Sequence, residues 1–359
     1  VAVDDGEAPD LATAPVWGLV RSAQWEHPDR FLLVDADRPG DVRWDLLLAA
    51  DVSQVALRGG RAFVPRLAAA AVVDAAVDAG GGWSPGPDGT VLITGGTGGL
   101  GAVLARHLAG AHGVRNLLLV SRRGWDAPGV EDLVAELEAL GAEPRVEACD
   151  VTDPLAVRAV LASVPGERPL TAVVHAAGVL DDATIESLSI EQVDRVFLPK
   201  VDAALVLDEL TAGMGLAAFV VFSSVAGTLG TPGQGNYAAA NVFLDALAQR
   251  RRARGRATTS LAWGPWEGAG MMRHEGNDLT RARMGRVGIT DLTEERGLAL
   301  FDAAVGAGEP HLVPVTIDVS ALGEGAPPLL RGLVRPTARR QRPSAADDGL
   351  ARRLSGLPQ

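Results

Sequence analysis

The sequence predicts an α/β protein built on a doubly wound parallel sheet, preceded by a smaller α/β subdomain. From Thr90 onward, short apolar segments alternate with helical segments, which is typical of a doubly wound sheet. The apolar segments are hydrophobic at consecutive positions rather than at every second one, as expected for parallel strands covered on both faces. Ligands of such sheets bind at the carboxyl ends of the strands.

Residues 1–87 form the smaller predicted subdomain. The stretch VWGLVRSAQWEHPDRFLLVDAD (16–37) combines a helical segment with the strand RFLLVD, and VALRGGRAFVPRL (55–67) is predicted to be a second strand. The Gly/Pro-rich segment 79–89 is predicted to be a linker. Because this region is short for a domain and the chain does not begin with methionine, we expect an incomplete subdomain whose earlier strands lie upstream.

Residues 88–335 form the predicted catalytic unit. Its predicted strands are, in order, TVLITGG (90–96), NLLLVSRR (116–123), PRVEACDV (144–151), TAVVHAAG (171–178), AAFVVFSS (217–224), ATTSLAWG (257–264) and HLVPVTID (311–318). Two of the intervening helical segments end at glycine, and a third begins with Asp153 as N-cap and Pro154 at the first helical position.

Two later segments break this alternation. The long irregular stretch at about 265–290 predicts an active-site lid. Residues 336–359 are rich in Pro and Arg and then polar, which predicts a linker leaving the domain.

Composition narrows the class of protein. The net charge of −12 argues against a nucleic-acid partner. The chain has no apolar run long enough to cross a bilayer, so no membrane partner is expected. Its single cysteine, Cys149, excludes a disulfide framework within the chain and suits a reducing cytosol, so we expect a cytoplasmic protein.

The basic residues are strongly skewed. Of 33 Lys and Arg residues, 32 are Arg, because Lys200 is the only lysine; Tyr237 is likewise the only tyrosine. This skew is typical of GC-rich coding, which replaces Lys and Tyr where Arg or Phe will serve. Survival of one of each is either chance or a sign that chemistry requires them.

A glycine-rich turn follows the first strand of the catalytic unit. In TVLITGGTGGLGAVLA, the residues Gly95, Gly99 and Gly101 allow a tight turn and let a pyrophosphate approach the N-terminus of the next helix. The strand before the turn and the helix after it favour a dinucleotide site over an ordinary glycine-rich turn.

The ends of the next two strands bear on the choice of cofactor. Ser121, Arg122 and Arg123 end the second strand, where an enzyme that uses NAD commonly has an acidic residue. Guanidinium groups suit a 2′-phosphate, so NADPH is favoured; the alternative is a solvated arginine pair. Asp150, after the third strand, is a candidate for binding the adenine amino group, or else it caps the turn before Asp153.

Polar residues gather at the ends of the fourth and fifth strands and on the next helix. His175 to Gly178 place small residues where backbone can pass close to a cofactor, and Ser223 and Ser224 end the fifth strand. Tyr237 and Asn241 are four residues apart and share one helix face. We expect these positions to meet in one crevice.

The set TGGTGGLG, HAAGV, FSS and YAAAN resembles a short-chain dehydrogenase/reductase, and more closely the ketoreductase domain of a modular polyketide synthase. The resemblance runs from about Thr90 to about residue 335, and the region before it resembles that family's non-catalytic structural subdomain. The usual short-chain enzyme has Tyr-x-x-x-Lys, whereas in polyketide ketoreductases the lysine and an asparagine exchange positions along the chain. Here Lys200 lies in FLPKV, and Asn241 takes the position after the tyrosine.

The resemblance implies a role for each catalytic candidate. Tyr237 would give a proton to the carbonyl oxygen on which hydride transfer develops negative charge, and a nearby Lys200 ammonium would lower the pKa of the phenol. Ser224 would donate a hydrogen bond to the same oxygen, and Asn241 would hold Lys200 or a relay water. The implied cofactor contacts come from the turn, the strand ends and the catalytic pair: Gly95, Thr97, Gly98, Gly99, Leu100, Gly101, Ser121, Arg122, Arg123, Asp150, Val151, His175, Ala176, Ala177, Gly178, Lys200 and Tyr237.

The resemblance also bears on product configuration. Leu180, Asp181 and Asp182 resemble the Leu-Asp-Asp signature of B-type ketoreductases, which give the D-3-hydroxyacyl product. The A-type tryptophan position is Leu229, and Ala239 stands where a proline would indicate epimerisation. Outside the family, the two aspartates would be interpreted as a helix N-cap.

The remaining candidates concern substrate and partners. Gln234 is a further substrate-orienting candidate, and Met271 and Met272 in the predicted lid would offer adaptable contacts to the substrate or simply pack. No metal site is expected, since His274 lacks ligand neighbours at suitable spacing. The resemblance implies an acyl carrier domain bearing a phosphopantetheine-tethered 3-ketoacyl chain as partner, together with other domains of the same synthase.

Two other functions compete. A free-standing short-chain reductase would have Tyr-x-x-x-Lys, which this sequence lacks. Such an enzyme would also have no N-terminal subdomain, whereas this sequence has one at residues 1–87. A redox-silent or epimerase-only module would lack Tyr237, Ser224, Lys200 or the glycines, all of which are present.

Overall fold

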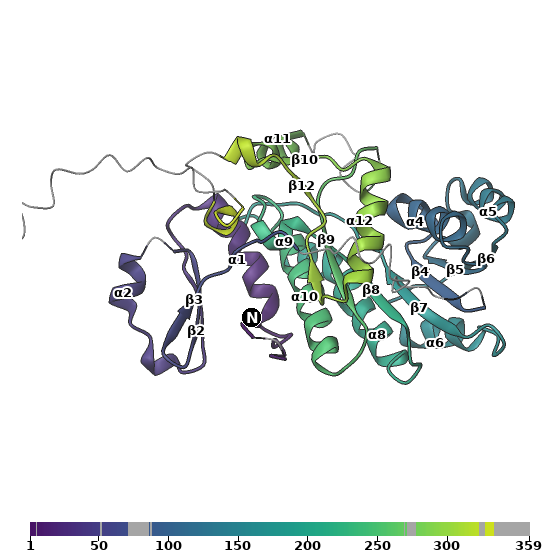
Figure 1. Cartoon of the computed structure of the whole chain (residues 1–359), viewed down its shortest axis with the longest axis horizontal. Coiled ribbons are helices and arrows are strands. Elements are labelled where there is room, and N and C mark those ends of the chain that lie inside the picture. Colours follow the sequence, from purple (N-terminus) through teal and green to yellow (C-terminus); the bar gives the residue numbers. More distant parts are fainter. Residues whose placement is uncertain are drawn as a thin grey trace, which may run out of the picture.

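The computed structural model describes residues 1–4, 6–50, 52–70, 86, 88–268, 270, 278–322 and 327–333. Within these residues the main sheet has seven strands in the order β11-β9-β8-β7-β4-β5-β6, all paired in parallel (Figure 1). The strands are β4 (Thr90–Thr94), β5 (Asn116–Ser121), β6 (Glu143–Ala148), β7 (Leu170–His175), β8 (Ala218–Ser224), β9 (Thr259–Trp263) and β11 (His311–Leu312). The predicted doubly wound α/β sheet is confirmed.

The chain reverses its direction of travel across the sheet at β4. It winds from β4 through β5 to β6 on one side, and then returns to β7 and continues through β8 and β9 on the other. The point between β4 and β7 is where connections leave in opposite directions, which opens a crevice at the carboxyl ends of these strands.

Helices lie on both faces of this sheet. The described helices that follow β4 are α4 (Gly99–Gly110), α5 (Val130–Ala139), α6 (Pro154–Ala162), α7 (Ile190–Phe197), α8 (Ala203–Leu210), α9 (Val225–Leu229), α10 (Gly235–Ala253), α11 (Asp278–Arg286) and α12 (Glu294–Ala307). Short 3-10 turns add η2 (Gly124–Asp126), η5 (Val319–Leu322) and η6 (Pro328–Leu330), and the π-helical turn η3 (Leu198–Asp202) joins α7 to α8.

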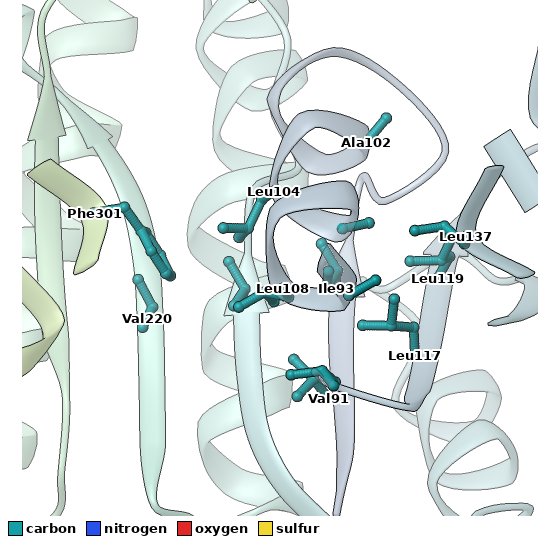
Figure 2. Packing of buried hydrophobic residues seen from close by; sticks show 14 of the residues in the cluster. Val91, Ile93, Ala102, Leu104, Leu108, Leu117, Leu119, Leu137, Val220 and Phe301 are labelled. Atoms are coloured by element: carbon teal, nitrogen blue, oxygen red, sulfur yellow. The ribbon is translucent and has the colours of Figure 1, made fainter. Parts of the chain in front are cut away.

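The continuous apolar runs are explained by two buried clusters, one on each face. Val91 and Ile93 of β4 pack with residues of α4, α5 and α12 such as Leu108 and Phe301 (Figure 2). Leu92, between them in sequence, points to the opposite face and packs with residues of α6, α8 and α10. Because successive side chains of a strand alternate between the faces, a sheet covered on both sides needs an apolar residue at every position.

The N-terminal segment forms a small sheet of its own. The parallel pair β1 (Leu33–Ala36) and β2 (Gln54–Arg58) continues into antiparallel β3 (Arg61–Phe63). The predicted strand 55–67 is thus a hairpin, because Gly59 and Gly60 both have positive φ and form a tight turn. Helix α1 (Ala14–Glu26) packs against α10, and the short helices η1 (Pro39–Asp41) and α2 (Trp44–Ala49) complete the segment (Figure 1).

The last predicted strand, 311–318, is divided in the structure. Its first part is β11, and its second part is β12 (Thr316–Ile317), which pairs antiparallel with β10 (Ile289–Thr290) outside the main sheet. Pro314 lies between the two parts, and a proline cannot donate the hydrogen bond that continues a ladder. None of the described helices has the length and apolar character needed to cross a membrane.

Candidate active site

A small cavity of about 80 Å³ lies at the carboxyl ends of β7, β8 and β9. It brings together three of the predicted catalytic residues, Lys200, Ser224 and Tyr237, with residues predicted to bind cofactor or substrate. The full lining is Leu100, Ala176, Leu180, Lys200, Phe222, Ser223, Ser224, Gln234, Tyr237, Trp263, Gly264, Pro265, Trp266, Gly270 and Met284. We call it the reactive cavity.

Lys200 reaches this cavity from the π-helical turn between α7 and α8, and its side chain is only 2% exposed. Its ammonium donates to the backbone carbonyl of Phe222 and to Oδ1 of Asn241, each at 2.9 Å. Burial lowers the pKa of Lys200 to about 7, although the charge of Asp245 acts in the opposite direction. Single π turns of this kind are often found at functional sites.

Tyr237 lies in the first turn of α10 and is 8% exposed. The Lys200 ammonium lies 5.2 Å from the centre of its ring, so the two residues share one cleft. Burial raises the pKa of Tyr237 to about 12, and interactions with Ser224 and Asn241 oppose this only in part. The lowered phenol pKa expected from the sequence is therefore wrong for this structure, because desolvation outweighs these hydrogen bonds and the charge of Asp182 raises the pKa further.

Asn241 links the two residues one helical turn further along α10. Its Nδ2 donates to the backbone carbonyl of Tyr237 at 2.8 Å, which turns Oδ1 toward the lysine. Ser223 donates to the backbone carbonyl of Asn241 at 3.2 Å. Ser224 ends β8 and caps α9, where its hydroxyl oxygen accepts from the N–H of Ala226 at 3.2 Å.

His175 is fully buried beneath the cavity and ties three elements together. Its Nε2 lies 3.2 Å from the backbone carbonyl of Lys200, and its Nδ1 lies 2.7 Å from the Thr94 hydroxyl. Burial, followed by the charge of Lys200, lowers the pKa of His175 to about 4. A neutral imidazole that donates from Nε2 and accepts at Nδ1 satisfies both contacts, so this side chain holds the lysine segment to β4 and β7.

Gly178 leaves room for the lysine. A Cβ at this position would lie 2.9 Å from Cε of Lys200. A larger residue would therefore displace the lysine side chain, a constraint that the sequence pattern alone did not reveal.

The glycine-rich turn forms an open cradle beside the reactive cavity. Gly95 has φ of 68° and packs against the backbone of Ala177, and a Cβ at Gly101 would lie 2.3 Å from the carbonyl oxygen of Gly95. At Gly98 and Gly99, by contrast, no described atom lies within 4 Å of an added Cβ. The turn is thus tight on its protein side and open in front of the first N–H groups of α4, as a pyrophosphate requires.

The predicted adenosine-side residues follow β5 and β6. Arg122 and Arg123 are exposed, and Ser121 accepts from the N–H of Gly124 at 3.0 Å. Asp150 accepts from the N–H and the hydroxyl of Thr152 at 3.0 and 2.8 Å, so its carboxylate also holds the turn. These bonds and, to a smaller extent, the charge of Arg122 lower the pKa of Asp150. Thr97 and Val151 are buried.

The segment 180–182 lies on the other side of the reactive cavity. Asp182 accepts from Nε2 of Gln234 at 2.8 Å, and burial raises its pKa. Asp181 accepts from Gln192 at 3.0 Å and pairs with Arg195 at 2.5 Å. Asp181 thus anchors the segment to α7, and Asp182 joins it to Gln234 at the start of α10.

Leu229 lies outside the reactive cavity and lines a neighbouring one of about 580 Å³ between the end of α1 and α11; Met284 lines both. Met271, Met272 and His274 lie outside the described residues, as do most of the linker 79–89 and the whole of the linker 336–359.

Two groups of residues were missed from the sequence. One is the face of α1 that contacts residues 227–233, beside the reactive cavity, through Arg21, Ser22, Trp25 and Glu26. The other is a cluster at the end of α4 and on α12, in which His107 of α4 and His112, just after it, each lie within hydrogen-bonding distance of Asp302 of α12. The nitrogen and oxygen atoms of this cluster that could bind a metal ion lie within 4.8 Å of one another. The sequence analysis had not identified a metal-ligand spacing at these residues.

Comparison with known proteins gives a consistent result. The family model described as KR domain matches residues 89–268, and the model described as polyketide synthase extender module SpnB, Rossmann fold domain, matches residues 1–67. The chain is 49% identical over 366 residues to the spectinabilin polyketide synthase system protein NorA' of Streptomyces orinoci, covering 99% of this chain and 10% of that protein. It is 56% identical over 256 residues to the pikromycin polyketide synthase component PikAII of Streptomyces venezuelae, covering 69% of this chain and 7% of that protein.

Solved structures extend the similarity to the fold. A structure described as A-type ketoreductases from a modular polyketide synthase is 39% identical, with a TM-score of 0.83, over 93% of this chain and 71% of that one. The first ketoreductase of the tylosin synthase is 42% identical, with a TM-score of 0.79, over 89% of this chain and 69% of that one. The similarity therefore covers both the N-terminal segment and the seven-stranded unit.

Proposed function

The chain belongs to the KR-domain family, the ketoreductases of modular polyketide synthases, and from this premise we propose that it uses NADPH to reduce the 3-keto group of a carrier-bound acyl chain. Members of this family are oxidoreductases of the short-chain dehydrogenase type that use a nicotinamide cofactor. The observation that carries the proposal is the meeting of Lys200 and Tyr237 in one cavity beside an open glycine cradle, with Asn241 hydrogen-bonded to both residues.

The residues around the cradle fit NADPH. The open positions Gly98 and Gly99 would accept the pyrophosphate at the N-terminus of α4. The exposed guanidinium groups of Arg122 and Arg123 would bind the 2′-phosphate, since arginine matches phosphate geometry. When bound, the cofactor supplies the hydride.

The residues of the chain supply the proton and hold the substrate oxygen. With a pKa of about 12, the Tyr237 phenol keeps its proton at neutral pH and can donate it to an alkoxide, which is far more basic. Lys200, with a pKa of about 7, can release or take up a proton at neutral pH, and its hydrogen bond to Asn241 fixes its position. The Ser224 hydroxyl would donate a hydrogen bond to the same oxygen.

The proposed stereochemical course is that of a B-type enzyme without epimerisation, giving a D-3-hydroxyacyl thioester. It is supported by Leu180, Asp181 and Asp182 on one side of the cavity, by Leu229 in place of the A-type tryptophan, and by Ala239 in place of proline. Leu180 lines the reactive cavity, where it can select one orientation of the chain.

The proposed partner is an acyl carrier domain that presents the 3-ketoacyl chain on a phosphopantetheine arm, with other synthase domains nearby. The relatives named above are synthase proteins of which this chain spans a tenth or less. A module of this kind would act on chains delivered by a linked carrier.

The test is to incubate the protein with NADPH or NADH and a 2-methyl-3-ketoacyl thioester and to resolve the product stereoisomers. We expect NADPH oxidation and a D-3-hydroxy product with an unchanged methyl branch. Changing Arg122 and Arg123 to Ala should raise the Michaelis constant for NADPH at least about tenfold, and that for NADH little. Absence of NADPH oxidation would contradict the activity, an L-hydroxy product the B-type assignment, and equal effects on both cofactors the 2′-phosphate site.

A further inference from the structure

We infer that Glu26, at the end of α1, is a positioning residue that clamps together the two loops on the substrate side of the reactive cavity and thereby controls product stereochemistry. This inference rests on the proposed function. It assigns a role in the reaction to a residue of the segment 1–67, which lies outside the part of the chain that the KR-domain model matches.

The carboxylate of Glu26 binds both loops at once. Its Oε2 accepts from the backbone N–H of Ile185 at 2.7 Å, and its Oε1 accepts from the backbone N–H of Gly233 at 2.8 Å. Hydrogen bonds to a carboxylate are shorter and stronger than those between neutral groups. One side chain therefore fixes the separation of two segments that are distant in sequence.

Both loops lead directly to the reactive cavity. The N–H of Ala183 donates to the carbonyl of Gly233 at 2.9 Å, next to the bond between Gln234 and Asp182. Leu180 from one loop and Gln234 from the other line the cavity itself. Since Gln234 is also the N-cap of α10, a shift of this loop would move the turn that carries Tyr237.

Helix α1 is held firmly enough to act as the fixed arm of the clamp. A Cβ at Gly18 would lie 2.3 Å from the carbonyl oxygen of Ala238, so α1 and α10 are in backbone contact beside Tyr237. Further along α1, Ser22 accepts from the N–H of Thr231 at 3.2 Å, and Trp25 donates to the carbonyl of Leu229 at 2.8 Å. These contacts fix the position from which Glu26 reaches the loops.

Glu26→Gln is the most direct variant, because the amide keeps the size of the side chain but can accept at only one of its two ends. Glu26→Asp keeps the charge but is one methylene too short to reach both amides. Glu186→Gln is the matched control: it removes a carboxylate next to Ile185, but this side chain is 78% exposed and pairs with His27 at 3.5 Å.

The experiment measures the dissociation constant for NADPH, kcat and KM for a 2-methyl-3-ketoacyl thioester, the product isomer ratio, and hydrogen exchange at the amides of Ile185 and Gly233. For Glu26→Gln and Glu26→Asp we expect an NADPH dissociation constant within about twofold of wild type, a fall in kcat/KM of about tenfold, and a several-fold rise in the minor isomer. Exchange at one or both amides should become faster, and Glu186→Gln should match wild type throughout.

The clamp would be overturned if both Glu26 variants kept the wild-type isomer ratio, whether or not kcat/KM fell. It would also be overturned if both amides kept wild-type exchange rates. A wild-type protein that fails to oxidise NADPH with the thioester would contradict the proposed function instead, and the exchange measurement would still decide whether Glu26 holds the two loops.

Discussion

At the scale of the residue, burial governs the chemistry of the Lys200–Tyr237 pair. Burial disfavours the charged form of each group, so it lowers the pKa of the lysine to about 7 and raises that of the tyrosine to about 12. The ammonium donates to Phe222 and Asn241, so its bonds hold it in place beside the phenol ring. The phenol consequently keeps its proton at neutral pH, as its proposed role of proton donor requires.

Replacing the lysine should reveal the free-energy cost of burying its charge. Its unfolded-state pKa of 10.5 exceeds the folded value of about 7, so the unfolded chain binds more protons between these values, and wild-type stability rises with pH across this window. Lys200→Met lacks this dependence. Between pH 7 and pH 9, we expect the free energy of unfolding of wild type to rise by about 2 kcal/mol relative to that of Lys200→Met.

Urea unfolding of both proteins at several pH values measures this gain, and an Arg158→Met variant is a control with an exposed cation. A constant difference between wild type and Lys200→Met across the window would show that the lysine is not desolvated in the folded state.

At the scale of the element, the sequence was a good guide to strands whose apolar runs are unbroken. The strands at 90–94, 116–121, 218–224 and 259–263 lie within their predicted ranges, because burial on both faces favours apolar residues at consecutive positions. The strand at 170–175 begins one residue before its predicted range, 171–178. It was a poorer guide where a run is interrupted. Pro314 divides one predicted strand, and Gly59 and Gly60 fold another into a hairpin. The π turn Leu198–Asp202, which carries Lys200 and contains Pro199, was not predicted.

The contact between α4 and α12 gives a pH-dependent element. Burial alone would raise the pKa of Asp302, but hydrogen bonds from His107 and His112 lower it to about 2. The bond to Asp302 raises the pKa of His112 above its ordinary value of 6.5. The stabilisation from His112 is therefore complete below pH 6.5 and is lost as the pH rises through the folded-state pKa.

Asp302→Asn should remove this stabilisation. We expect the variant to lower the melting temperature more at pH 6 than at pH 8, measured by circular dichroism, with the difference in unfolding free energy widening by about 1 kcal/mol as the pH falls. Asp318→Asn is the control, because this exposed carboxylate accepts hydrogen bonds from the backbone N–H and the hydroxyl of Ser320 rather than from a histidine. An equal effect at both pH values would show that the cluster does not titrate as a unit.

At the scale of the whole molecule, the site is assembled from both segments of the chain. The sequence pointed to the residues that we propose as catalytic, since Lys200 and Tyr237 are the only lysine and the only tyrosine and Ser224 ends a predicted strand. It did not reveal what holds them. Gly178 and His175 act through packing around the lysine, and Glu26 acts across a contact between α1 and two distant loops. Such contacts depend on tertiary placement, which periodicity and spacing do not specify.

The most direct measurement of the central claim is the single-turnover rate of NADPH oxidation by Tyr237→Phe with a 3-ketoacyl thioester, beside the dissociation constant for NADPH. Because the phenol is the proposed proton donor, we expect the rate to fall by about 10²- to 10⁴-fold while cofactor binding changes less than about twofold. A Tyr237→Phe protein that kept a rate within tenfold of wild type would contradict the assignment of proton donation to Tyr237.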